Sequence, residues 1–118
     1  MRLAERQKIA REKARAIMGD ELFAVIYAAI NSGAPVKFFY TDRYGVKKEY
    51  VGEYPLSFFE TPQDADWPGS VLLWSWHELH SKKEQYRVER ILSAKRIITL
   101  FDALLNPSTN AEFWAGVA

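Results

Sequence analysis

The stretch PVKFFYTDRYGVKKEYV, residues 35–51, decides the fold class of this chain. Residues 36–41 are rich in β-branched and aromatic side chains and follow a period of two, which favours a β-strand. Residues 42–45 form a turn signal that ends in glycine, and residues 46–51 carry the β pattern again. This stretch therefore predicts an antiparallel β-hairpin.

The chain downstream of this hairpin repeats the short β pattern several times. We predict further strands at residues 54–59, 71–79 and 85–91. Residues 94–100 fit either a short sixth strand or the start of a helix, and residues 60–69 read as an irregular loop. Five or six short strands with tight turns indicate a small, strongly bent antiparallel β-barrel rather than a parallel sheet.

Two helices are predicted upstream of the hairpin. Residues 2–18 carry a narrow, mostly alanine apolar stripe at helical spacing. After a break at Gly19, Asp20 fits the N-cap of a second helix over residues 21–31, most of whose circumference is apolar. Gly33 then fits a left-handed C-cap. The predicted fold class is α+β and mainly β, with the helices before the barrel.

The length of 118 residues corresponds to one compact domain. We divide the chain into a basic amphipathic helix at 1–19, a barrel domain with its leading helix at 20–105, and a C-terminal tail at 106–118. In the tail, Phe113 and Trp114 would expose a large apolar area if they were left uncovered. We therefore expect a homo-oligomer that associates through its termini.

The composition excludes several classes of protein. The chain has no cysteine, which removes disulfide scaffolds, thiolate metal sites and cysteine nucleophiles. No apolar run approaches the ~20 residues of a membrane-spanning helix. The charged N-terminus lacks the apolar core of a signal peptide. We expect a cytoplasmic protein without membrane contact.

Basic side chains gather at the N-terminus. Residues 1–18 contain six basic and two acidic side chains, a net charge of +4, whereas the whole chain carries +1. Arg6, Lys13 and Arg15 of this basic helix are candidates for contact with phosphates. The same charges also suit a helix that is merely solvated, and both interpretations stay open.

The sequence offers little support for catalysis. His77 lies in a predicted strand and His80 begins the turn after it, and we expect both to be partly exposed. Residues three apart in a strand point to opposite faces, so the two histidines could not share a metal ion by local geometry. No glycine-rich phosphate loop is present. Asp64 and Asp66 lie in a polar loop without an apolar pocket to shift their pKa values. We expect no enzyme activity, no metal and no cofactor.

Aromatic side chains make up 14% of the chain and give a clearer signal. Trp74 and Trp76 share one face of a predicted strand, as do Tyr86, Val88 and Arg90 of the next. Aromatic rings interleaved with arginine on a small β-barrel often hold single-stranded nucleic acid, with bases stacked and phosphates paired. The tryptophans also suit a structural role in the core, and Arg90 suits an ion pair with a nearby glutamate.

Four motifs occur in a set order along the chain. The first is IYAAINSGAPVKFFY, residues 26–40, in which a helix passes into a strand that ends in tyrosine. Gly45 follows in the hairpin, and YPL, residues 54–56, places a proline before the next strand. YRVERI, residues 86–91, is an aromatic-Arg-aliphatic-acid-Arg-Ile segment. In this order and spacing, within residues 25–94, the motifs resemble the WYL domain family.

The resemblance implies an Sm-like β-barrel that binds nucleic acid or a nucleotide-like ligand. Members of the family usually follow a winged helix-turn-helix in bacterial transcription regulators, or serve as accessory proteins in defence systems. Two positions depart from the family pattern. VLL, residues 71–73, stands where the family has Trp-Tyr-Leu, and Glu84 replaces an arginine. Both positions belong to the ligand-sensing surface of the family.

We therefore predict a non-enzymatic regulatory module that binds nucleic acid, preferably single-stranded, or a nucleotide-like ligand. The arginines would meet phosphates or a carboxylate, and the aromatic rings would stack or line the pocket. The candidate site residues are Tyr40, Trp74, Trp76, Tyr86, Arg87 and Arg90. A second class that fits the sequence is a homodimerising interaction domain without a ligand.

Overall fold

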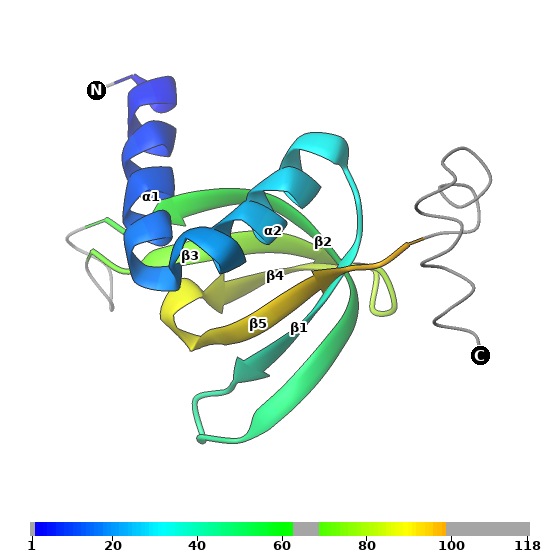
Figure 1. Ribbon diagram of the computed structural model, residues 1–118. Coiled ribbons are helices and arrows are strands. Elements are labelled where there is room, and N and C mark those ends of the chain that lie inside the picture. Colours follow the sequence, from blue (N-terminus) through cyan, green and yellow to red (C-terminus); the bar gives the residue numbers. More distant parts are fainter. Residues whose placement is uncertain (1, 63–68, 99–118) are drawn as a thin grey trace.

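A computed structural model describes residues 2–62 and 69–98 of the chain (Figure 1). Two helices precede a five-stranded antiparallel sheet with the strand order β4-β3-β2-β1-β5, so the expected α+β, mainly β class is confirmed. The elements are α1 (Leu3–Met18), α2 (Asp20–Ser32), β1 (Val36–Thr41), β2 (Lys47–Glu60), β3 (Val71–His77), β4 (Lys82–Arg87), a 3₁₀ helix η1 (Val88–Arg90) and β5 (Ile91–Arg96).

The first helix, α1, packs against the domain through its smallest side chains. Ala10 and Ala14 are fully buried, while Leu3 and Ile17 of the predicted apolar stripe are exposed. Asp20 is the first residue of α2 and not its N-cap, because Gly19 occupies the cap position. The Asp20 carboxylate instead accepts a hydrogen bond from Arg15 Nε at 2.7 Å. A carboxylate in the first helical turn still faces the positive end of the helix dipole.

The second helix, α2, supplies one wall of the core. Ile26 and Ala29 are buried, and Phe23 packs its ring on that of Phe58 at a centroid distance of 5.5 Å. Gly33 ends the helix in the left-handed conformation, with φ of 67° and its N–H bonded to Ala29 O, as predicted. Figure 1 shows α2 beside the curved sheet. No helix in the described part of the chain is long and apolar enough to cross a membrane.

The long strand β2 corrects the sequence prediction of two strands at 46–51 and 54–59. Gly52 adopts a φ of +81°, and pairing continues through it. On the N-terminal side β2 pairs with β1, up to Glu53 opposite Val36, and from Glu53 onward it pairs with β3. Glycine and proline suggested a break, but a glycine at positive φ allows a bulge that bends one strand between two partners.

The region after β4 also differs from the prediction of a strand at 85–91, followed by a short strand or the start of a helix at 94–100. The strand β4 ends at Arg87, and Val88–Arg90 forms the 3₁₀ helix η1, after which β5 pairs with β1. Arg90 therefore does not share a strand face with Tyr86. The chain leaves the ladder here because it must cross from the β3 side of the sheet to the β1 side. Residues 99 and 100 lie outside the described part of the chain.

The sheet is open in its hydrogen bonding, with β4 and β5 at its two edges. The short helix η1 connects these edge strands. Closure of the sheet into a barrel remains a prediction.

Four aromatic rings meet in the hollow of the sheet, with Tyr86 at their centre. The Tyr86 ring lies 4.9 Å from Phe38, 5.1 Å from Tyr40 and 5.4 Å from Tyr50, measured between centroids. All three contacts are edge-to-face, the geometry that aromatic quadrupoles prefer. Tyr86 and Tyr40 are buried, so this cluster forms part of the core and not a loose surface patch.

A fully buried carboxylate, Glu53, lies beneath the aromatic cluster. Tyr86 Oη donates to Glu53 Oε1 at 2.5 Å, and Ser75 Oγ donates to Oε2 at 2.7 Å. His77 Nδ1 lies 2.6 Å from Glu53 Oε1. The oxygen does not lie along the direction in which the ring N–H would point, so the two groups are close but form no aligned hydrogen bond. His77 is thus buried, which corrects the expected partial exposure, and its ring contacts that of His80 at 4.4 Å.

The bond from Tyr86 to Glu53 can be tested by removing single hydroxyl groups. Tyr86→Phe is expected to lower the free energy of unfolding by about 1.5–3 kcal/mol, because it takes a donor from a buried carboxylate. Tyr50→Phe, in the same cluster, removes a hydroxyl without such a partner and should change stability by less than about 0.5 kcal/mol. Urea denaturation of both variants measures the difference. Equal stability of the two would show that the Glu53 bond contributes nothing.

The bend at Gly52 gives a second stability prediction. A Cβ added at Gly52 would meet no atom within 4 Å, so Gly52→Ala introduces no clash. Its positive φ nevertheless disfavours any side chain, and we expect a loss of about 1–2 kcal/mol in the free energy of unfolding. Thermal and urea denaturation measure this loss. Unchanged stability would mean that the strand bends without help from the glycine.

Candidate functional site

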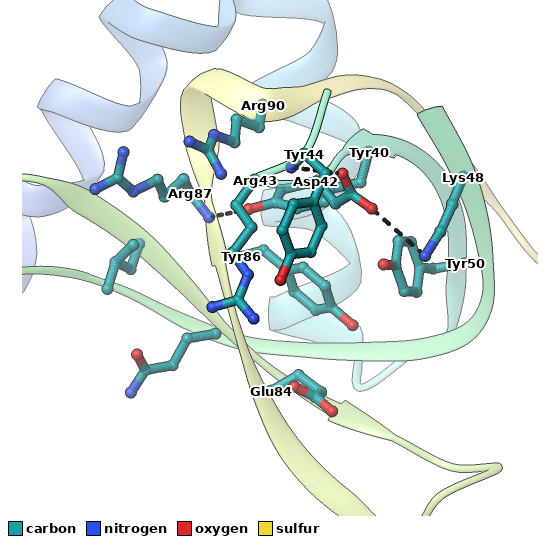
Figure 2. Close-up of a pocket in the computed structure, with 12 residues that line it drawn as sticks. Tyr40, Asp42, Arg43, Tyr44, Lys48, Tyr50, Glu84, Tyr86, Arg87 and Arg90 are labelled. Atoms are coloured by element: carbon teal, nitrogen blue, oxygen red, sulfur yellow. Dashed lines mark hydrogen bonds and ion pairs between the residues drawn. The ribbon is translucent and has the colours of Figure 1, made fainter. Parts of the chain in front are cut away.

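A cleft of about 610 Å³ opens between the β1–β2 hairpin, β4 and η1. Figure 2 shows four tyrosines grouped with Arg43 and Lys48 beside β4, with the Arg87 side chain on the other side of that strand. This volume lies within the roughly 300–1,000 Å³ range of small-molecule sites. Its lining consists of Tyr40, Asp42, Arg43, Tyr44, Lys48, Tyr50, Leu72, Glu84, Gln85, Tyr86, Arg87 and Arg90.

Four tyrosines give the cleft an aromatic lining. Tyr40 and Tyr86 belong to the buried cluster, whereas Tyr44 is 74% exposed at the hairpin turn. The Tyr40 hydroxyl accepts a hydrogen bond from the backbone N–H of Arg87 at 3.0 Å, which ties β1 to the end of β4 (Figure 2). The lining therefore combines a rigid inner part with an exposed ring at the mouth.

The charged side chains of the cleft have an excess of positive charge: three arginines and one lysine against two carboxylates. Both carboxylates already have partners. Asp42 Oδ1 accepts the backbone N–H groups of Tyr44 and Val46, each at 2.9 Å, and Oδ2 lies 3.4 Å from Lys48 Nζ. Glu84 pairs with Lys82 at 3.0 Å. The cleft is thus suited to an anion.

The arginines of the cleft differ in their surroundings. The Arg43 guanidinium lies over the Tyr44 ring, 4.9 Å from its centroid. Arg87 Nη1 lies 3.7 Å from Glu89 Oε1. Arg90 forms no ion pair with Glu84 or Glu78 in the described part of the chain, so the ion-pair interpretation of Arg90 gains no support.

Three groups in the cleft have shifted pKa values, and each shift favours the usual charge state: ionised for Asp42 and neutral for Tyr50 and Tyr86. The backbone N–H of Val46, followed by that of Tyr44, lowers the pKa of Asp42, which stays ionised and holds the turn. Burial raises the pKa of Tyr50. Burial and then the hydrogen bond to Glu53 raise the pKa of Tyr86 far above the ordinary phenol value. Both raised pKa values keep the Tyr50 and Tyr86 phenols neutral.

The chemistry of the lining suits a ligand with both a planar ring and a phosphate or carboxylate. Guanidinium groups bind such anions in a bidentate manner, and tyrosine faces stack on rings. No group of three His, Asp or Glu side chains in residues 2–62 and 69–98 could hold a metal ion.

The structure brings together four of the six predicted site residues. Tyr40, Tyr86, Arg87 and Arg90 all line the cleft. Trp74 and Trp76 do not line it, although Leu72 of the same strand does. Leu73 and Ser75, which alternate with the tryptophans along β3, are buried in the core. Strand alternation then turns both tryptophans to the outer face of β3.

The basic helix residues lie away from the cleft. Lys13 Nζ contacts the Glu60 carboxylate, and Arg15 pairs with Asp20. Arg6 lines a separate hollow against β2 and β3. Two of the three predicted phosphate contacts therefore have carboxylate partners within the chain.

Five lining residues come from the hairpin and were missed by the sequence analysis: Asp42, Arg43, Tyr44, Lys48 and Tyr50. A signal for two of them existed. Once the turn is fixed, the register places Lys48 opposite Tyr40 and Tyr50 opposite Phe38. Cross-strand partners lie on the same face of a sheet, so the hairpin alone predicts this grouping.

No protein-family model matches the chain, and no curated protein matches it. Among solved structures, the chain is similar to part of the proteasome accessory factor B/C (PafBC) of Arthrobacter aurescens, at 17% identity and a TM-score of 0.49. The match covers 72% of this chain and 11% of the PafBC chain, so this chain spans about a tenth of that protein's length. A likeness of this degree says nothing about function.

Proposed function

We propose that the chain is a non-enzymatic, WYL-like regulatory module of the cytoplasm that binds a nucleotide unit, either free or within a nucleic acid strand. The observation that carries the proposal is the convergence of four tyrosines and four cations on one cleft of about 610 Å³. The base of a nucleotide would stack on the tyrosine rings, and its phosphate would bind the arginines.

The positions of the arginines support phosphate binding. Arg87 ends β4 and Arg90 ends η1, and both residues line the cleft. Figure 2 shows the Arg87 side chain on the other side of β4 from the tyrosine rings, so Arg87 lies at the margin of the cleft. Arg43 adds a third cation from the hairpin, already stacked on an exposed ring. A phosphate has several acceptor oxygens, and such a cluster can donate to more than one of them.

The same lining supports binding over catalysis. No serine, threonine, histidine or cysteine borders the cleft among the described residues, so these residues offer no Ser–His or Cys–His pair there. Ser75 and His77, which could make such a pair elsewhere, lie around the buried Glu53.

The alternative of a homodimerising interaction domain depends largely on Phe113 and Trp114. Both lie outside the described residues. The apolar second helix places Ile26, Ala29 and Phe23 in or against the core of its own chain. We therefore propose the binding module.

Arg90→Gln should weaken binding of a fluorescein-labelled oligothymidylate by about 1.5–3 kcal/mol, because one charged hydrogen bond to phosphate is lost. The slope of log affinity against log salt should also fall by about 0.7, the value for one phosphate contact on a single strand. Fluorescence anisotropy across a salt series measures both quantities.

The matched control is Lys95→Gln, which removes one positive charge from β5, outside the cleft. It should leave affinity nearly unchanged. Equal losses in the two variants would indicate nonspecific charge attraction and contradict a cleft-specific site. Absence of binding by the wild-type protein to both the oligomer and thymidine monophosphate at about 50 mM salt would overturn the proposed function.

A further inference from the structure

A second hollow, of about 280 Å³, lies between α1 and the strands β2 and β3. It is bordered by Leu3, Arg6 and Gln7 of α1, Ser57, Phe58, Phe59 and Glu60 of β2, and Trp74 of β3. Trp74, which the sequence analysis singled out for stacking, thus lines this hollow and not the tyrosine cleft.

The second hollow offers the same two kinds of group as the cleft. Trp74 lies nearly parallel to Phe59, with ring centroids 5.2 Å apart and an interplanar angle of 21°. Arg6 is exposed and has no ion pair within the described part of the chain. Glu60 at the border is paired with Lys13, so its negative charge is offset. The hollow therefore combines an aromatic surface with an available cation.

The two hollows adjoin across a single pair of strands. In the β3–β4 ladder Trp74 pairs with Gln85, and Gln85 lines the tyrosine cleft. The next pair along the same face is Leu72 with Arg87, and both of these residues line the cleft as well. Cross-strand partners have Cβ atoms roughly 4.5–5.5 Å apart. The cleft and the hollow are therefore separated by the spacing between two cross-strand neighbours, Gln85 and Trp74.

We infer that the Trp74–Arg6 hollow is a second subsite for the ligand of the cleft. A free nucleotide would occupy only one of the two sites. A strand of several nucleotides could place one base in the cleft and pass over the Gln85–Trp74 pair. Its next base and phosphate would then bind in the hollow beside α1. The ligand class is therefore single-stranded nucleic acid. This inference rests on the proposed function and specifies which kind of nucleotide ligand the chain binds.

The subsite can be tested with the full chain and a length series of labelled oligothymidylates and oligouridylates, from a mononucleotide to roughly 16 nucleotides. Affinity should rise with length until the strand reaches both sites. Trp74→Ala should remove this increment and weaken the longer strands roughly 5- to 150-fold, the range expected for one lost stack. Mononucleotide binding should stay unchanged, because Trp74 does not line the cleft.

Two further variants separate a subsite from a folding defect. Trp74→Phe keeps an aromatic ring against Phe59 and should retain most of the length dependence. Arg6→Gln should lower the salt slope for long strands by about 0.7, whereas Lys8→Gln removes the same charge from an exposed position of α1 that borders neither hollow and should not.

The outcomes distinguish the inference from the proposed function. If a mononucleotide binds with sensitivity to Arg90→Gln but affinity does not rise with length, the second subsite is wrong and the proposed function stands. Equal binding of duplex and single strands, or equal competition by polyglutamate, also overturns the subsite. If neither a mononucleotide nor any oligonucleotide binds, the proposed function itself fails.

Discussion

The hydrogen bonding of one buried carboxylate, Glu53, constrains the rest of the structure. Glu53 follows the bend at Gly52 and accepts hydrogen bonds from Ser75 on β3 and Tyr86 on β4. A buried carboxylate that lacks donors is strongly destabilising, so these three strands must keep their register for the domain to fold. The hydrogen bonds of Glu53 thereby specify which face of each strand is turned to the core. Apolar packing alone would define these orientations less strictly.

This constraint passes directly to the candidate site. Because Tyr86 is fixed from below by Glu53, its ring holds Tyr40, Tyr50 and Phe38 in edge-to-face contact, and Tyr40 in turn binds the backbone at Arg87. The inner part of the cleft is thus continuous with the core. Its cations, in contrast, lie at the margin: Arg43 in the hairpin turn, Lys48 near the start of β2, Arg87 at the end of β4 and Arg90 in η1. A buried aromatic base with cations at its margin suits a ligand that has both a ring and an anionic group.

Sequence patterns predicted the helices, the hairpin and most of the cleft's inner residues, because these depend on local periodicity and on glycine at a helix end. They failed where tertiary pairing overrides a local signal. Gly52 and Pro55 suggested a break, yet β2 continues through both. Arg90 was placed by strand alternation, yet η1 intervenes. The division of the tryptophans from the tyrosines follows from alternation along β3, but only the structure shows which face meets the core.

The open edge at β4 has a consequence for how copies of this protein associate. An edge strand presents unpaired backbone groups, which can recruit strands from other molecules. In β4 these groups are flanked by Lys82, Lys83, Glu84 and Arg87, four charged side chains in six residues. Another strand would have to approach through this charge, which discourages growth into extended β-aggregates. The strand that lines the cleft through Glu84, Gln85, Tyr86 and Arg87 is therefore also protected against misassembly.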